Sequence, residues 1–140
     1  MQEKTFPGTL DSLAPLRAYV TEAGRAAGLD SARIYNLCLA VDEITTNIVL
    51  HGYEEVGLKG DIAVRVLQER GQLIIRLSDH GRSYDPDKVP SPDSDNPLNQ
   101  QTGGWGLFLS KAAVDQFDYT SSDSGNVHLF VMQLPGGGQG

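Results

Sequence analysis

Two side chains that could do chemistry lie four residues apart within residues 42–53: the carboxylate of Glu43 and the carboxamide of Asn47. On an α-helix four residues advance about 400°, so the two side chains lie about 40° apart, and His51 continues the same line. A carboxylate there could accept a proton from an attacking hydroxyl, and an amide oxygen could complete a magnesium shell. Polar pairs one turn apart are also common on solvated helix faces that bind nothing, and the spacing alone favours that alternative.

A second carboxylate, Asp79, follows the alternating hydrophobic and polar residues 73–77, and Gly81 comes two residues later. This pattern places Asp79 at the end of a strand, where loops form sites on a rigid scaffold. Its carboxylate could accept a hydrogen bond from an exocyclic amine, which would select adenine over guanine. Taken alone, the pair fits an ordinary turn better, because Asp and Gly are common turn residues.

Three glycines, Gly103, Gly104 and Gly106, directly precede a predicted helix that begins near Leu107. Such a loop lets backbone amides approach a ligand, and the amino end of the helix aims its unpaired amides at an anion such as phosphate. Plain loop flexibility explains the glycines equally well. Because the chain has no G-x-x-x-x-G-K-S/T motif, this segment is not a P-loop.

The first predicted elements are a short strand over residues 4–6 and a helix. Asp11 or Ser12 is expected to cap this helix, and Gly28 is expected to end it.

A longer second helix should begin after Asp30 or Ser31 and end near His51 and Gly52, and it carries both Glu43 and Asn47. Its apolar face lies more than a quarter turn from these two residues, so one side can pack while the other faces a cavity. The predicted apolar face comprises Ile34, Leu37, Cys38, Val41, Thr45 and Ile48.

Two hairpins are expected from the alternating residues. The first joins residues 62–66 to residues 73–77 through Arg70 and Gly71. The second joins residues 118–122 to residues 127–134 through a turn at residues 124–126. Residues 107–114 are expected to form a third helix, and residues 81–104 a long loop, which in a compact domain is usually functional or disordered.

Composition sets the class of the molecule. With 140 residues and 39% hydrophobic content, the chain is expected to form one domain over residues 1–135 with a disordered tail at 136–140. The formal net charge of -7 argues against direct binding to nucleic acid or to an anionic membrane. A single cysteine, Cys38, excludes an internal disulfide and favours a reducing cytosol. Neither a signal pattern nor a membrane-length apolar run is present, so we expect a cytoplasmic protein.

The three segments that could do chemistry are the one with Glu43 and Asn47, the one with Asp79 and Gly81, and the glycine-rich one before Leu107. In this order they resemble the GHKL ATPase superfamily of gyrase, heat-shock chaperone, histidine kinase and MutL domains. Within it the chain looks most like the stand-alone bacterial anti-sigma-factor serine/threonine kinases, and the resemblance runs from the first strand to Leu134. The matching segments are Glu43-x-x-x-Asn47 with His51-Gly52-Tyr53, Asp79-x-Gly81 with Tyr84-Asp85-Pro86, and Gly103-Gly104-Trp105-Gly106-Leu107-Phe108-Leu109.

The resemblance implies an α+β two-layer sandwich of the Bergerat ATP-binding type, with a mixed, mostly antiparallel sheet and about three helices on one face. By the same resemblance Glu43 would be the general base and Asn47 the magnesium ligand. Asp79 would recognise adenine, and Gly81 would let the adenine ring approach. The chain would use ATP and Mg²⁺, under a lid near residues 82–102. The other residues implied to contact nucleotide are His51, Tyr84, Asp85, Thr102, Gly103, Gly104, Trp105, Gly106 and Leu107, the last four at the phosphates.

The family implies partners as well. Such kinases sequester a sigma factor, phosphorylate an anti-anti-sigma protein of the STAS type on Ser or Thr, and are commonly homodimers. We therefore expect an anti-sigma regulatory kinase in a partner-switching system.

Two departures from the family pattern keep a rival interpretation open. Ser83 stands where the wider superfamily often has another glycine, which narrows the assignment to the anti-sigma group. No Lys or Arg occurs from Val89 through Ser110, so only Arg82 or Lys88 could balance charge on the γ-phosphate. The rival is a module that binds nucleotide to shape a docking surface without transferring phosphate. A catalytic domain of a histidine kinase is a weaker third alternative, because no dimerisation helix with an acceptor His is evident.

Overall fold

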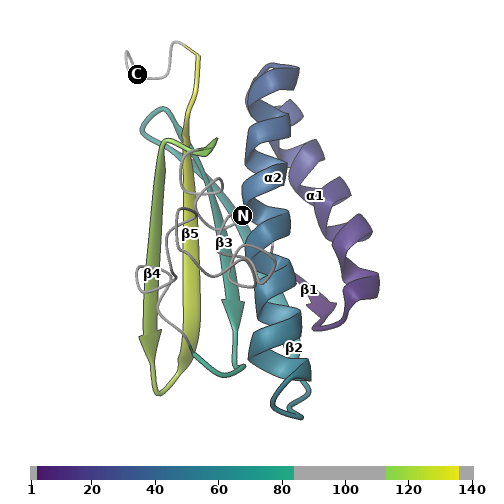
Figure 1. The fold of residues 1–140 in the computed structure, drawn as a ribbon. Helices are drawn as coiled ribbons and strands as arrows, with labels where there is room; N and C mark the ends of the chain where they lie inside the picture. Colours follow the sequence, from purple (N-terminus) through teal and green to yellow (C-terminus); the bar gives the residue numbers. More distant parts are fainter. Residues whose placement is uncertain (1–2, 84–112, 136–140) are drawn as a thin grey trace, which may run out of the picture.

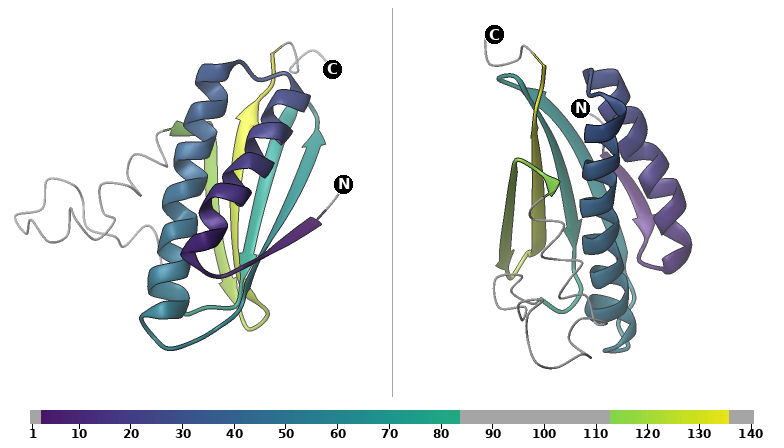
Figure 2. Two further views of the ribbon diagram at one scale, coloured as in Figure 1. Left: turned by 90° about the vertical axis from the view of Figure 1, so that its right-hand side faces the viewer. Right: turned by 45° about the horizontal axis from the view of Figure 1, so that its top comes forward.

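The computed structural model describes residues 3–83 and 113–135. These residues form two layers, a five-stranded sheet and a pair of α-helices on one of its faces (Figures 1 and 2). The order across the sheet is β1-β2-β3-β5-β4, and every described pairing is antiparallel. The elements are β1 (Glu3–Pro7), η1 (Leu10–Ser12), α1 (Leu13–Ala27), α2 (Ser31–Asn47), η2 (Ile48–Glu54), β2 (Asp61–Glu69), β3 (Gln72–Asp79), β4 (Gln116–Ser122) and β5 (Gly125–Gln133).

This architecture confirms the predicted α+β fold with helices on one face of the sheet. Two α-helices are described, and the predicted third helix at residues 107–114 lies almost entirely outside the described residues. The predicted sheet was mixed and mostly antiparallel, and among the described strands the pairing is antiparallel throughout.

The helix boundaries follow from local side-chain chemistry. Asp30 caps α2 as predicted, because its Oδ1 accepts a hydrogen bond of 2.9 Å from the N–H of Arg33. Ser12 occupies the cap position of α1 but does not cap it with its side chain; its hydroxyl donates instead to the carbonyl of Pro7 at 2.6 Å. Gly28 ends α1 as predicted, in a left-handed conformation with φ of 95°.

The second helix runs further than predicted. The α-helical part ends at Asn47, and the chain continues as the π-helix η2 to Glu54 instead of stopping near His51 and Gly52. The N–H of Glu55 bonds the carbonyl of Leu50, five residues earlier, at 2.8 Å. Such wide turns are rare and frequently lie at functional sites.

The first hairpin turns at Arg70 and Gly71 as predicted, and both residues have positive φ, of 53° and 74°. Two-residue hairpin loops favour this geometry because it matches the twist of the strands. The closing hairpin turns earlier than predicted, since Gly125 and Asn126 already belong to β5.

The core lies between the helices and the covered face of the sheet. It is built from the apolar side of both helices and from alternating strand residues such as Ile62, Val64, Ile75, Leu77 and Phe130. Cys38 is buried in this core, as the sequence predicted. Among the described residues, no helix has both the length and the apolarity that spanning a membrane demands.

Candidate functional site

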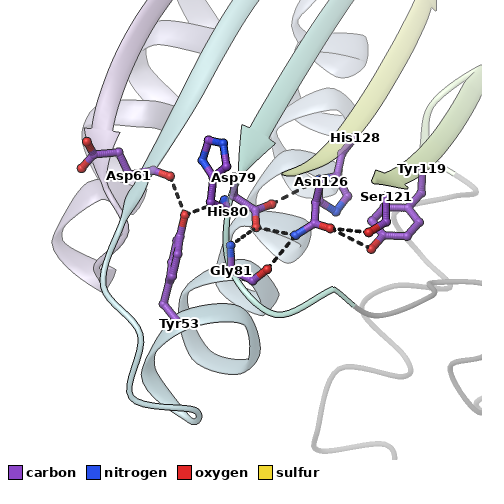
Figure 3. Close-up of polar contacts among 9 residues, drawn as sticks. All are labelled: Tyr53, Asp61, Asp79, His80, Gly81, Tyr119, Ser121, Asn126 and His128. Atoms are coloured by element: carbon purple, nitrogen blue, oxygen red, sulfur yellow. Dashed lines mark hydrogen bonds and ion pairs between the residues drawn. The ribbon is translucent and has the colours of Figure 1, made fainter. Parts of the chain in front are cut away.

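Asp79, the last residue of β3, is 2% exposed and is held by two donors (Figure 3). Its Oδ1 accepts from the N–H of Gly81 and from Nδ2 of Asn126, each at 2.9 Å. Its Oδ2 is buried and has no hydrogen-bond partner among the described residues. A buried acceptor without a donor is costly, so Oδ2 is a candidate position for a ligand that donates a hydrogen bond.

The sequence did not single out Asn126 as a functional residue, because it was assigned to a turn. In the structure β5 pairs with β3 so that Asn126 lies directly opposite Asp79. The Asn126 Nδ2 also donates to the carbonyl of Gly81 at 3.0 Å, and its Oδ1 accepts from Ser121 Oγ at 2.8 Å. Asn126 is in phase with the buried residues His128 and Phe130 of the alternating strand, and this spacing is the signal that could have identified it.

His128 lies two residues further along β5 and is 1% exposed. Burial lowers its pKa to about 4, and the neighbouring Asp79 carboxylate only partly opposes this effect. The imidazole is therefore neutral at pH 7. Its Nδ1 lies 3.9 Å from Asp79 Oδ2, which is too far for a hydrogen bond, so His128 leaves that oxygen unpartnered.

A small pocket of about 160 Å³ adjoins these side chains. Its walls are Ile48, Asp79, Arg82, Tyr119, Asn126 and His128. A larger pocket, of about 1150 Å³ by the same measure, lies between the turn after β1 and the loop before β2, and none of the predicted site residues lines it. The small pocket is the better candidate site of the two, because Asp79, with its buried unpartnered oxygen, lines it.

Gly81 lies against the backbone of Gly52 in η2. A Cβ at Gly81 would stand 2.7 Å from the carbonyl oxygen of Gly52 and 2.8 Å from its carbonyl carbon. The adjacent Arg82 N–H donates to the same oxygen at 2.8 Å. The structure therefore gives Gly81 a packing role, in addition to its predicted role of letting the adenine ring approach.

Tyr53 ties η2 to the other side of the Asp79 turn (Figure 3). Its hydroxyl donates to the carbonyl of Asp61 at 2.7 Å and accepts from the N–H of His80 at 2.9 Å. The side chain is 2% exposed, and this burial raises its pKa. Tyr53 thus fixes the turn in which Asp79 sits, a role that its sequence neighbours did not predict.

Glu43 and Asn47 occupy the last turns of α2. Burial, and secondly the charge of Asp42, raise the pKa of Glu43 above its ordinary value. Asn47 is 6% exposed. The next residue, Ile48, lines the small pocket with Asp79, so the structure brings the Asn47 end of the helix to the Asp79 site.

The His51 ring contacts Glu55, with Nδ1 3.1 Å from Oε2. The other oxygen of Glu55 accepts from Arg82 Nη2 at 2.6 Å, and the hydrogen bonds from Arg82 and then His51 lower the pKa of Glu55. Arg82, a candidate to balance phosphate charge, is thus engaged elsewhere. The remaining predicted residues lie outside the described residues: Tyr84, Asp85, Lys88, Thr102, Gly103, Gly104, Trp105, Gly106 and Leu107.

The residues present fit ATP with magnesium. The Asp79 Oδ2 matches the exocyclic amine of adenine, which is a hydrogen-bond donor. Among the described residues no group of three or more His, Cys, Asp or Glu could cage a metal. A magnesium ion held by one amide oxygen, that of Asn47, together with phosphate and water oxygens suits this donor set, since Mg²⁺ usually keeps waters and substrate phosphates.

Comparisons with known proteins show the family of the chain. Residues 6–132 match the model of the histidine kinase-like ATPase domain family. The chain is 29% identical to the serine-protein kinase RsbW of Halalkalibacterium halodurans, over 89% of this chain and 78% of that protein. It is 34% identical to the serine/threonine-protein kinase BtrW of Bordetella bronchiseptica, over 71% of this chain and 70% of that protein.

Solved structures show the same fold. A structure of the RsbU and RsbW domains of a Mycobacterium tuberculosis protein aligns with a TM-score of 0.63 and 20% identity. The alignment covers 96% of this chain and 33% of that one, so this chain spans about a third of that protein's length. The chain is therefore a member of the histidine kinase-like ATPase domain family, and its curated relatives place it beside the serine/threonine protein kinases of that family.

Proposed function

We propose that this chain is an ATP- and magnesium-dependent serine/threonine protein kinase that acts as an anti-sigma regulatory factor in a partner-switching system. The observation that carries the proposal is the buried Asp79 Oδ2, which lacks a partner among the described residues and borders a pocket at the end of α2. The kinase relatives RsbW and BtrW support phosphotransfer as the outcome of nucleotide binding.

Glu43 is the proposed general base. It takes the proton of a partner's Ser or Thr hydroxyl as that oxygen bonds to the γ-phosphorus and the bond to the leaving ADP breaks. Burial raises the pKa of Glu43, which makes its carboxylate a stronger base than an exposed glutamate. Asp79 holds the adenine end of ATP, so binding far from the reacting atoms helps to position the γ-phosphoryl group.

Asn47 is the proposed magnesium ligand. The ion, when bound, neutralises charge on the phosphates. Asn47 is largely buried and is the last residue of α2, so few conformations of its amide remain open before the nucleotide arrives. The proposed nucleotide contacts further include His51, Tyr84, Asp85 and residues 102–107.

The proposed partners are a sigma factor, which the chain sequesters, and a small anti-anti-sigma protein of the STAS type, which it phosphorylates. A homodimer is the proposed assembly. The net charge of -7 supports a protein partner, because a nucleic-acid backbone would be repelled.

One observation favours a second candidate, a module that binds nucleotide without transferring phosphate. Arg82 is paired with Glu55, and the sequence has no Lys or Arg from Val89 through Ser110. Of the two cations that the sequence offers there, this leaves Lys88, which lies outside the described residues. Without it the transition state would have no side-chain cation beside the magnesium ion.

The decisive experiment mixes the full chain, magnesium and γ-labelled ATP with a purified STAS-type anti-anti-sigma protein. Acid-stable label on the partner is the expected result, since phosphoserine survives acid and phosphohistidine does not. Binding of ATP without transfer would favour the module. An Asp79→Ala chain serves as the control that should neither bind ATP nor label the partner.

A further inference from the structure

The Asp79 carboxylate has two oxygens with different surroundings, and one residue makes the difference. Oδ1 is occupied by two donors, the Gly81 N–H and the Asn126 Nδ2, both at 2.9 Å. Oδ2 has no partner among the described residues. Gly81 reaches Oδ1 from within the turn, whereas Asn126 reaches it from the neighbouring strand.

The orientation of the Asn126 amide is itself fixed. Its Oδ1 accepts from Ser121 Oγ at 2.8 Å and from the Tyr119 hydroxyl at 3.4 Å. The Asp79 carboxylate can only accept and an amide nitrogen can only donate, so Nδ2 must face Asp79, and the amide oxygen is left to accept from these hydroxyls. Nδ2 also donates to the Gly81 carbonyl at 3.0 Å, which uses its second hydrogen (Figure 3).

Burial shields this arrangement from solvent. Asn126 is 4% exposed and Asp79 is 2% exposed, so water does not compete freely for either side chain. The two residues lie opposite each other in the β3–β5 pairing, so the sheet itself sets the distance between their backbones. The nearby His128 does not share the role, because its Nδ1 lies 3.9 Å from Oδ2 and makes no hydrogen bond.

We propose that Asn126 is a positioning residue for adenine recognition, holding Asp79 so that Oδ2 faces the exocyclic amine, and that Ser121 supports Asn126 by donating to its amide oxygen. This inference rests on the proposed function, because it assigns how this site selects adenine. Selectivity for adenine then depends on three hydrogen-bonded residues on neighbouring strands: Ser121 of β4, Asn126 of β5 and Asp79 of β3.

The test compares two ligands that differ only in the recognised group: ATP, and purine riboside 5′-triphosphate, which lacks the exocyclic amine. Affinities of the full chain are measured with magnesium by calorimetry. The wild-type chain should prefer ATP by about tenfold or more, as expected for a hydrogen bond to a charged group. The ratio of the two affinities is the readout, because a purely structural defect would weaken both ligands together.

In Asn126→Ala the preference for ATP should fall below about threefold, while affinity for the analogue stays within about threefold of wild type. Ser121→Ala should give an intermediate ratio. The matched control is Ser122→Ala, since the neighbouring Ser122 hydroxyl bonds Ser124 and not Asn126. Ser121 is exposed, so its replacement decides the matter even where Asn126→Ala fails to fold.

A full ATP preference in Asn126→Ala overturns the proposal, as does equal loss of both ligands. Where Asn126→Ala does not fold, an unchanged ratio in Ser121→Ala overturns it. Failure of the wild-type chain to bind ATP would instead refute the proposed function, which keeps the two failures distinct.

Discussion

Gly81 and Gly52 touch backbone to backbone, and this contact joins the turn after β3 to the π-helix after α2. The space is asymmetric: a Cβ on Gly81 would lie 2.7 Å from the Gly52 oxygen, whereas a Cβ on Gly52 would meet nothing nearer than 3.7 Å. The two glycines of one contact therefore differ in what they tolerate.

We predict that Gly81→Ala destabilises the fold by about 1–3 kcal/mol, because the methyl group overlaps backbone that cannot rotate away. Gly52→Ala, the matched control, should change the free energy of unfolding by less than about 1 kcal/mol, since its Cβ makes ordinary contacts. Urea unfolding of both variants measures this. Equal costs at the two positions would contradict the packing role assigned to Gly81.

Glu43→Gln should lower phosphotransfer by about 10² to 10⁴, because the amide cannot accept the hydroxyl proton. Affinity for ATP should change by less than about threefold, since Glu43 is assigned to the partner's hydroxyl and not to the nucleotide. Single-turnover transfer and equilibrium binding separate the two effects. A Glu43→Gln chain that labels its partner at the wild-type rate would refute the assigned base.

The transfer rate should also depend on pH with a definite sign. The base works when ionised, so the rate should rise with pH through the pKa of Glu43, and burial with the Asp42 charge moves that rise above the range of an ordinary glutamate. Asp42→Asn removes a like charge, so the rise should move to lower pH. A pH–rate profile of the two chains checks the direction, and a shift upward would be inconsistent with it.

Asn47→Ala should weaken ATP binding about tenfold in magnesium and little in a chelator, because only the metal-dependent part uses the amide oxygen. The measurement is ATP affinity titrated with and without free Mg²⁺. Asn36→Ala is the control, since Asn36 is an exposed residue of the same helix. An equal loss with and without the metal would show that Asn47 acts on the fold rather than on magnesium.

His128 should make the protein sensitive to mild acid. Its folded pKa of about 4 lies below its ordinary 6.5, so the unfolded chain binds a proton that the folded chain refuses. The contribution is complete above pH 6.5 and is lost as the pH falls toward 4, by roughly 3 kcal/mol in total. Unfolding of His128→Phe at pH 7 and pH 4.5 should show a smaller loss than wild type. His80→Asn, which replaces an exposed imidazole, should keep the wild-type loss.

Much of the fold could be predicted because local chemistry decides it. The Asp30 cap, the Gly28 helix end and the turn at Arg70 and Gly71 each depend on a few neighbouring residues. The position of Asp79 at the end of a strand followed from simple alternation of apolar residues. These features need no knowledge of distant contacts.

The unpredicted features all depend on distant contacts. Asn126 and Asp79 are 47 residues apart, and their bond exists only once β5 has paired with β3 in one register. The π-helix likewise accompanies the contact between Gly52 and Gly81, which no local pattern encodes. Local turn propensity therefore placed Asn126 in the turn, and sheet pairing overrode it.

The register of β3 against β5 has a functional consequence. The groups proposed to select the nucleobase are fixed by neighbouring strands of the sheet, whereas most residues assigned to the phosphates belong to residues 84–112. Substitutions in the second set can thus abolish transfer while the proposed adenine contacts stay in place, whereas loss of the Asp79 contact removes binding and transfer together.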